Sequence, residues 1–433
     1  MKQIKKYIYI FILIILSASA IQKEFSIINI KPLKGAIIKK KLPKFNSKSF
    51  FNGKFQNEFN NYVENNIGFR PPLIRINNQI DYSLFNITHA NSVIIGKENY
   101  LYEKGYILSY LGRNFIGKKA IDEKLKKLKY LQDKLKEKNI DLIVVFAPGK
   151  ASFFPEYIPE KFNPSDKKIS NYEYYSKRCN DFKINNIDFN KYFMLMKDTS
   201  TYPLYSKYGI HWSIYGMTLA SDSLIKYIEK KRNIDMPDLS WDRIDVTNKL
   251  RGTDYDIGRG LNLLWQMPHK KMAYPHLVFE KNKNKKQPSV IAIADSYYWN
   301  IFSSGISKNI FKLGGFWYYN KKIYPDSFKK TKTTDMVNIK AEIEKQDVII
   351  LMATEATLKK FAFGFIDRLY SIYTSKKYTD YNVDELLKYE TAIRNNKKLM
   401  KKVKAKAKKR GISLDEMVYK DALWIYKHKR VNK

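Results

Sequence analysis

Three continuous runs of apolar residues lie in the interior of the chain, at 141–147, 289–294 and 348–352. Runs of this kind are typical of strands that are buried on both faces of a parallel sheet. The segment 121–139 instead places apolar residues on one helical face and charges on the other, and 213–231 is a second helical stretch. Helices that alternate with buried strands predict an α/β fold, a doubly wound parallel sheet flanked by helices, with ligands at the carboxyl ends of the strands.

The N-terminus has the order of a secretory signal. Lysines are followed by the apolar run 7–16 and by small residues, and 18–20 reads as an A-x-A cleavage site. The run is shorter than the roughly 20 residues that a spanning helix needs. We therefore predict that residues 1–21 are either a cleaved signal peptide or a membrane anchor. The polar, lysine-rich residues 22–48 predict a linker, because proline and glycine interrupt any periodicity there.

The rest of the chain predicts one large domain and an appendage. Residues 49–365 contain the buried runs and form the predicted catalytic-sized domain, which opens with two short helices between residues 50 and 84. Residues 366–433 are richer in lysine and have helical spacing, so we expect a basic helical tail there.

The formal net charge of +38 suggests an anionic partner, such as nucleic acid, an anionic lipid surface or an acidic polymer. Export excludes nucleic acid, while the N-terminus predicts contact with a membrane. The charge also has a simpler explanation, because lysine is abundant and arginine scarce, as an AT-rich genome encodes, and lysine is the ordinary solvated surface residue.

Ser296 and His211 are the best candidates for chemistry. Ser296 follows a buried strand at its carboxyl end, where a hydroxyl with a nearby base could act as a nucleophile; the alternative is a turn that caps the next helix. His211 lies in the loop before a helix that Ser213 can cap, and from there it could reach a strand end; the alternative is a packing histidine beside Trp212.

Other candidates are weaker. Lys150 could bind a carbonyl or an anionic sugar group, or it could be a solvated loop lysine. Glu355 follows the last strand near the expected cleft, but an acid at a helix start explains it equally well. The sequence has no H-x-x-x-H, no cysteine cluster and no phosphate loop, so we predict neither a metal nor another cofactor.

Several motifs occur in the order in which a known family has them, and together they resemble the AlgJ/AlgX-like alginate O-acetyltransferase branch of the SGNH hydrolases over roughly residues 45–360. His211-Trp212 is similar to the end of that family's D-x-H-W motif, and Ala294-Asp295-Ser296-Tyr297 is similar to its G-D-S-[FY] block. The other matching segments are 51–79, 96–102, and 147–150 with 154–156.

The resemblance implies an SGNH-like fold in which Ser296 is the nucleophile and His211 its general base. The family's triad aspartate has no counterpart, since Gly209 occupies its position. Three explanations are open: another carboxylate orients His211, with candidates Asp254, Asp256 and Asp295; the enzyme works as a slower dyad; or the protein binds without catalysis. Loss of an orienting acid costs orders of magnitude in rate in serine enzymes.

As a function, the resemblance implies a periplasmic or membrane-attached O-acetyltransferase that acetylates the hydroxyls of an exported or cell-envelope polysaccharide. It also implies a membrane-bound O-acyltransferase (MBOAT) partner. By the same resemblance, Tyr319 and Asn320 are possible oxyanion or substrate-binding groups, since an asparagine supplies such a donor in SGNH enzymes generally; the alternative is a simple turn asparagine. Two alternatives are an SGNH-type esterase that deacetylates such a polymer and a noncatalytic glycan-binding or assembly protein.

Overall fold

The computed structural model of the protein describes residues 2–35, 40–279, 284–312, 314–374, 383–412 and 414–431. The chain forms two compact units. The first comprises Met1–Glu103, Lys207–Ile210 and Tyr255–Lys270, and the second comprises Lys104–Ser206, His211–Asp254 and Lys271–Lys433.

The first unit is built from helices and one hairpin. Its elements are α1 (Lys2–Phe25), α2 (Ser47–Phe51), α3 (Lys54–Asn66), α4 (Arg70–Phe85), α11 (Asp256–Gly260) and the antiparallel strands β1 (Val93–Ile95) and β2 (Leu101–Glu103). The two helices predicted between residues 50 and 84 correspond to α3 and α4, and the short helix α2, which begins at Ser47, precedes them. Gly53, with φ of +76°, separates α2 from α3, and Pro71 stands in the first turn of α4, where a missing N–H costs nothing.

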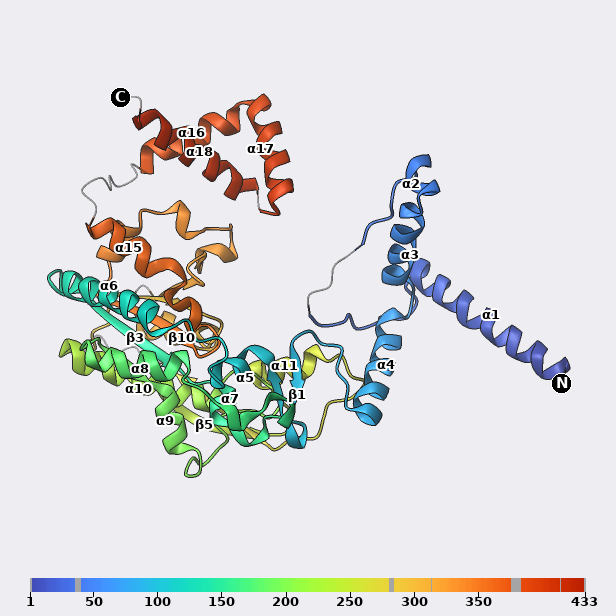
Figure 1. Ribbon diagram of the computed structural model, residues 1–433, viewed down its shortest axis with the longest axis horizontal. Helices are drawn as coiled ribbons and strands as arrows, with labels where there is room; N and C mark the ends of the chain where they lie inside the picture. Colours follow the sequence, from blue (N-terminus) through green and yellow to red (C-terminus); the bar gives the residue numbers. More distant parts are fainter. Residues whose placement is uncertain are drawn as a thin grey trace. The chain divides into compact units, whose positions relative to one another are not determined.

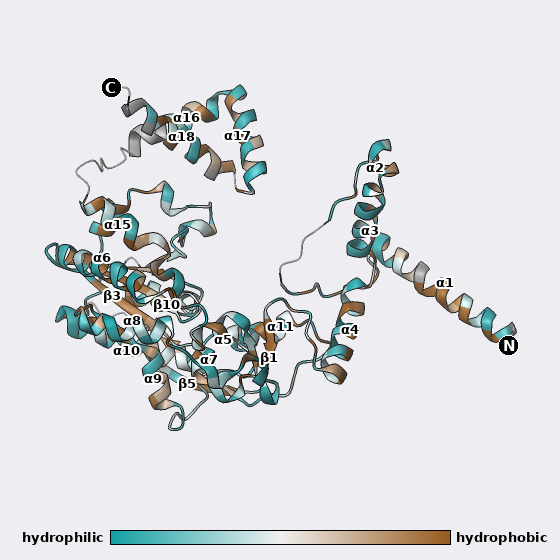
Figure 2. Cartoon of the chain, viewed as in Figure 1, coloured by the Kyte–Doolittle hydropathy of each residue, from teal (hydrophilic) through white to brown (hydrophobic). Residues whose placement is uncertain are grey.

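Helix α1 is long and apolar enough to cross a membrane, over Gln3–Phe25, by length and composition. Figure 2 shows apolar residues along this helix and polar residues at its N-terminal end. The helix is longer than the apolar run 7–16 because the small residues that follow continue it. A signal sequence has the same features, so the helix is compatible with both predicted fates of this segment.

The second unit is organised around a six-stranded sheet in the order β4-β3-β10-β7-β8-β9. Its strands are β3 (Asp141–Ala147), β4 (Asn186–Asp188), β7 (Val290–Ala294), β8 (Gly315–Tyr318), β9 (Lys322–Tyr324) and β10 (Val348–Thr354). All pairs are parallel except β8 with β9, so the predicted parallel sheet flanked by helices is confirmed. Strand β9 runs antiparallel to β8 because the two strands are joined by a tight turn at Tyr319 and Asn320, both with φ of +50°, and a turn this short allows only an antiparallel return.

Helices α6 (Lys118–Lys136), α8 (Asn171–Asp181) and α15 (Phe365–Thr374) share one hydrophobic core with the sheet. Figure 1 shows α6 running beside β3, with which it is in contact. The leucine face of α6 is fully buried, as its spacing predicted. Because α15 belongs to this core, the packed sheet domain includes residues beyond 365; the predicted domain limits themselves stay predictions.

The remaining elements surround the sheet or follow it. Helix α10 (Ile214–Arg232) packs on β6 (Met272–Val278), which forms an antiparallel hairpin with β5 (Ser240–Thr247), and α9 (Phe189–Met196) contacts β3. The shorter helices are α5 (Lys104–Tyr110), α7 (Lys150–Phe153), α12 (Tyr298–Ser303), α13 (Ile306–Ile310) and α14 (Ile339–Glu344). The C-terminal helices α16 (Val383–Asn395), α17 (Lys397–Arg410) and α18 (Leu414–Val431) pack around their own small core (Figure 1).

Candidate active site

Ser296 lies at the carboxyl end of β7, a strand that has β10 on one side and β8 on the other. The strand itself is fully buried, whereas Ser296 is partly exposed in the turn that leads into α12. Parallel strands present their carboxyl ends to the same edge of the sheet, so this serine stands at the edge where α/β folds bind ligands.

His211 is held by the segment that leads into α10. Ser213 caps this helix by accepting a hydrogen bond of 2.9 Å from the N–H of Gly216, and its own hydroxyl donates to the carbonyl of Pro203 at 2.7 Å. The neighbouring Trp212 is completely buried against aromatic rings. The histidine is thus placed by a capped helix start and a packed indole, while its own ring stays partly exposed.

The fold brings the two candidate residues together. Nε2 of His211 lies 3.0 Å from Oγ of Ser296, although the residues are 85 positions apart. This is the hydrogen-bond distance that proton transfer from a nucleophile to its base requires. The ring of Tyr297 packs against the imidazole with ring centroids 4.7 Å apart, so the histidine is supported from the residue next to the serine.

Asp295 locks the turn that carries Ser296. Its Oδ1 accepts the N–H of Tyr297, and its Oδ2 accepts three hydrogen bonds, from the N–H and the hydroxyl of Thr354 and from the hydroxyl of Thr357, at 2.6–2.9 Å. The side chain is 1% exposed. These bonds tie the end of β7 to the end of β10, so Asp295 fixes the position of the serine.

The other two carboxylates predicted as orienting acids lie in different surroundings. Asp254 is fully buried in the second unit; burial and the charge of Asp254 together raise the pKa of the Tyr274 hydroxyl. Asp256 belongs to the first unit, where its Oδ1 accepts the N–H groups of Ile210 and Ile257 at 2.9 and 2.7 Å. Gly209 lies in that unit too.

A chain of buried tyrosines supports Tyr297, and no pattern in the sequence predicts it. The hydroxyls of Tyr205 and Tyr297 are 3.0 Å apart, and Tyr205 donates to the carbonyl of Pro148 at 2.6 Å. Burial raises the pKa of both hydroxyls, with a further contribution to Tyr297 from Tyr106. Both tyrosines therefore stay neutral donors. Tyrosine is common throughout this chain, so composition could not single them out.

Lys150 and Glu355 are both buried at the carboxyl ends of β3 and β10. Lys150 begins α7 and is 0% exposed, so the alternative of a solvated loop lysine is wrong. The carboxyl of Glu355 accepts hydrogen bonds from Ser152, at 2.5 Å, and from the amide of Asn190. Burial raises the pKa of Glu355 to about 7, and the bonds from Ser152 and Asn190 offset only part of this effect.

We expect Glu355 to make stability depend on pH. A carboxyl whose pKa is raised in the folded state stabilises fully below its unfolded pKa of 4.5, and this contribution is lost as the pH rises towards 7. Glu355→Gln should therefore be more stable than the wild type at pH 8, by roughly 3 kcal/mol, and unchanged near pH 4.5. Urea unfolding at both pH values measures this. The exposed Glu123→Gln is the matched control; equal pH dependence in all three proteins would refute the assignment.

Tyr319 and Asn320 lie in the turn after β8 and line a cavity of about 670 Å³. The amide of Asn320 donates to the carbonyl of Phe363 at 3.2 Å, and its backbone carbonyl accepts from Thr334. Neither Ser296 nor His211 lines this cavity. The oxyanion role of Asn320 therefore stays a prediction.

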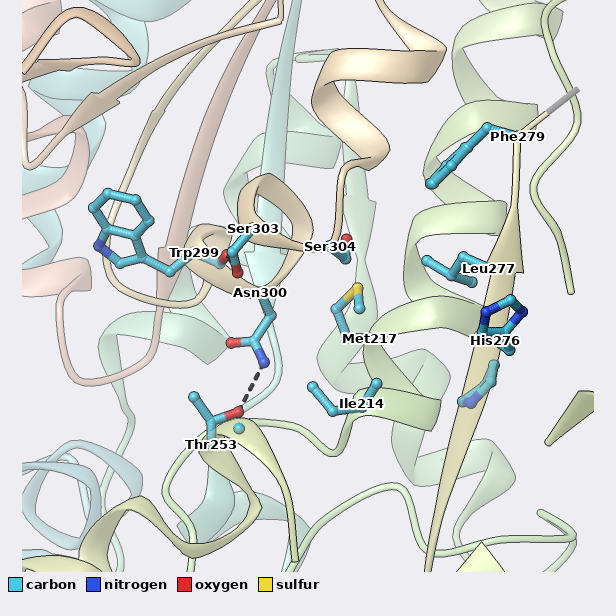
Figure 3. A pocket seen from close by; sticks show the side chains of 12 residues that line it. Ile214, Met217, Thr253, His276, Leu277, Phe279, Trp299, Asn300, Ser303 and Ser304 are labelled. Carbon is cyan, nitrogen blue, oxygen red and sulfur yellow. Dashed lines mark hydrogen bonds between the residues drawn. The ribbon is translucent and has the colours of Figure 1, made fainter. Parts of the chain in front are cut away.

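A second cavity, of about 450 Å³, lies beside the two helices that follow the candidate residues (Figure 3). Trp299 and Asn300 come from α12, Ile214 and Met217 from α10, and Leu277 from β6. The wall is mostly apolar, with a few polar groups between. Within the described ranges, no group of three or more His, Cys, Asp and Glu side chains could hold a metal ion.

Residues 93–243 match the model of a family described as the SGNH hydrolase-like domain of acetyltransferase AlgX. This part of the chain is similar to an AlgX-type SGNH hydrolase-like domain. The resemblance to the AlgJ/AlgX-like branch is thereby confirmed. The matched part of the AlgX-type domain contains His211 and ends before Ser296.

Solved structures similar to this chain include the O-acetyltransferase domain of Pseudomonas putida AlgJ, at 13% identity, with 65% of this chain and 99% of that chain covered and a TM-score of 0.40. Pseudomonas aeruginosa AlgX is similar at 12% identity, with 64% and 67% covered and a TM-score of 0.40. Bacillus cereus PatB1 is similar at 12% identity, with 57% and 93% covered and a TM-score of 0.33. No curated protein sequence matches the chain.

Proposed function

We propose that this protein is an O-acetyltransferase that transfers acetyl groups to the hydroxyls of an exported or cell-envelope polysaccharide. The observation that carries the proposal is the distance of 3.0 Å between Nε2 of His211 and Oγ of Ser296 at the carboxyl edge of the sheet. The match of residues 93–243 to the AlgX acetyltransferase domain supports the choice of reaction.

In the proposed mechanism, Oγ of Ser296 attacks the carbonyl carbon of an acetyl donor while Nε2 of His211 takes the hydroxyl proton. The tetrahedral intermediate collapses, the donor's leaving group takes the proton back from His211, and the acetyl group remains as an ester on Ser296. A sugar hydroxyl then attacks this ester as His211 removes its proton. Release of the acetylated sugar returns that proton to Ser296, so atoms and charges balance.

The surroundings suggest how the pair is positioned. All the hydrogen bonds described above for the Asp295 carboxylate lead to the turn and to β10, so we assign it the positioning of Ser296 rather than the orientation of His211. Asp254 and Asp256 stay candidates for the orienting acid. We place the substrate in the cavity of Figure 3, because its two lining helices begin directly after Ser296 and His211.

We also propose that the protein works outside the cytoplasm, in the periplasm or attached to the membrane by its N-terminal segment. The apolar helix α1 and the lysines in its first turns support this. Acetyl donors made in the cytoplasm would then have to deliver their acyl group across the membrane, and an MBOAT-type partner would supply this step.

The direct test is product analysis. Purified protein is incubated with an activated acetyl ester and a soluble oligosaccharide, and mass spectrometry follows the sugar. We expect oligosaccharide that has gained acetyl groups. Free acetate with unmodified sugar would instead favour the esterase, and no consumption of the ester would remove the enzyme assignment.

Replacement of His211 tests the base separately. We expect His211→Ala to lower the rate of acetyl transfer by roughly 10²–10⁴-fold, because a positioned general base contributes that much. Reaction with a serine-directed fluorophosphonate should slow in parallel. His428→Ala, an exposed histidine of α18, is the control and should keep the wild-type rate. Equal rates in both variants would leave Ser296 without its base.

A further inference from the structure

The cavity that Tyr319 and Asn320 line is surrounded by lysines. Four lysine side chains contribute to its wall, Lys124 from α6, Lys321 from the turn after β8, and Lys359 and Lys360 from the segment after β10. Strands β8 and β10 are the two neighbours of β7. The cavity therefore opens at the ligand-binding edge of the sheet, although it is separate from the lining shown in Figure 3.

Lys124 differs from an ordinary surface lysine. It is half-buried, and burial lowers its pKa, which means that its ammonium group has lost part of its hydration. Its hydrogen bond goes to the carbonyl of Phe361, at 3.3 Å. The acid whose charge acts on Lys124 is Asp367, and Lys127 binds that carboxylate at 2.6 Å.

The positive charge around this cavity is not balanced by acids. Among the described residues, none of the four lysines forms an ion pair with a carboxylate, and no acid lines the wall. Lys321, Lys359 and Lys360 are exposed, whereas Lys124 has lost part of its hydration, and a partly desolvated cation without a counter-charge is unfavourable unless a ligand supplies the anion. Lysine-rich composition explains exposed lysines on a convex surface, but it does not explain a half-buried one at a cavity.

The rest of the cavity wall is partly aromatic, and this restricts the class of ligand that fits the cavity. Tyr319 and Phe363 meet edge to face, with ring centroids 4.9 Å apart, and both line the cavity. Aromatic rings of this kind offer an apolar surface to the C–H face of a sugar. The volume of about 670 Å³ lies in the range of small-molecule sites.

We propose that this cavity binds a sugar that carries a phosphate group, with the lysines around the phosphate and the aromatic pair against the ring. Phosphate fits better than carboxylate for two reasons. A phosphomonoester brings up to two negative charges, and lysine binds phosphate as a point charge, whereas planar carboxylate recognition favours arginine, which is absent from the wall. The proposal goes beyond the acetyl-transfer function and does not depend on it.

Isothermal titration of the full chain in detergent, at constant ionic strength, tests the site with glucose 6-phosphate. We expect saturable binding that the double variant Lys124→Gln/Lys359→Gln weakens about tenfold or more, because two charge-assisted contacts are lost. Lys119→Gln/Lys126→Gln removes the same charge from exposed positions of α6 and should bind as the wild type does.

Three further probes define the ligand. Inorganic phosphate should bind more weakly than glucose 6-phosphate, and glucose should not bind measurably. Glucuronate should bind several-fold more weakly; equal affinity would overturn the assignment to phosphate. Absence of saturable binding, or equal losses in the two double variants, would overturn the site itself. Circular dichroism confirms that each variant is folded, and Ser296→Ala should bind glucose 6-phosphate normally, which separates this proposal from the catalytic one.

Discussion

Ser296→Ala should abolish acetyl transfer, with a loss of roughly 10³-fold or more in kcat/KM. The variant lacks the oxygen that forms the ester, and His211 then has no hydroxyl to deprotonate. The side chain is small and partly exposed, so the fold should be unaffected. The measurement is the rate of transfer from an activated acetyl ester to an oligosaccharide, together with the mass of any trapped acyl-enzyme.

Ser371→Ala is the matched control, because this serine is exposed on α15, its hydroxyl donates to the backbone carbonyl of Asp367, and it lines neither cavity. It should keep wild-type transfer and labelling. A covalent adduct that persists on the Ser296→Ala variant would place the nucleophile elsewhere.

Asp295→Asn should lower both stability and activity. The buried carboxylate accepts four hydrogen bonds, and an amide cannot accept all of them because its NH₂ group would face donors. We expect the free energy of unfolding to fall by about 2–4 kcal/mol, since hydrogen bonds to a charged group are worth more than neutral ones. Urea unfolding measures the loss, and the transfer assay reports how far Ser296 has moved.

Thr357→Val gives the comparison for this prediction. It removes one donor to Asp295 and keeps the carboxylate, so it should cost only about 1 kcal/mol. An Asp295→Asn variant as stable as the wild type would show that the bonds between the ends of β7 and β10 contribute little to the fold.

The central part of the fold could be predicted from the sequence because burial there is complete. The run 141–147 is β3 without change, the run 289–294 contains β7, and 348–352 begins β10. Strands buried on both faces must be apolar throughout, so they stand out from their surroundings. The helix expected at 121–139 is α6 for the same kind of reason, since one of its faces is fully buried.

The edge of the sheet could not be predicted in this way. Strands β4 and β9 have three residues each and lie at its two edges, where polar side chains are tolerated, and β9 reads as part of a loop. Its antiparallel direction follows from the tight turn at Asn320. Neither strand is long enough to produce a recognisable period.

Only part of the candidate site could be predicted from the sequence. Ser296 and His211 were singled out by their places beside a buried strand and before a capped helix, together with the family motifs. The role of Asp295 was not, because nothing in the sequence indicates that its carboxylate accepts hydrogen bonds from Thr354 at the end of β10 and from Thr357 in the turn that follows. Tyr205 and Tyr297 were hidden for a similar reason, since their hydroxyls meet across 92 positions of the chain.

By itself, the sequence determined which segments must leave water, and hence the parallel sheet, the helix α6 and the apolar N-terminal helix. These follow from local patterns of apolar residues, because whether a side chain is driven out of water depends on the residue type at that position. Only the tertiary structure decided that an imidazole and a hydroxyl 85 positions apart come within 3.0 Å, and that four lysines share one cavity. Contacts of this kind depend on the order of the strands and on the paths of the loops. These are decided when distant segments pack together, and they produce no periodic pattern in the sequence.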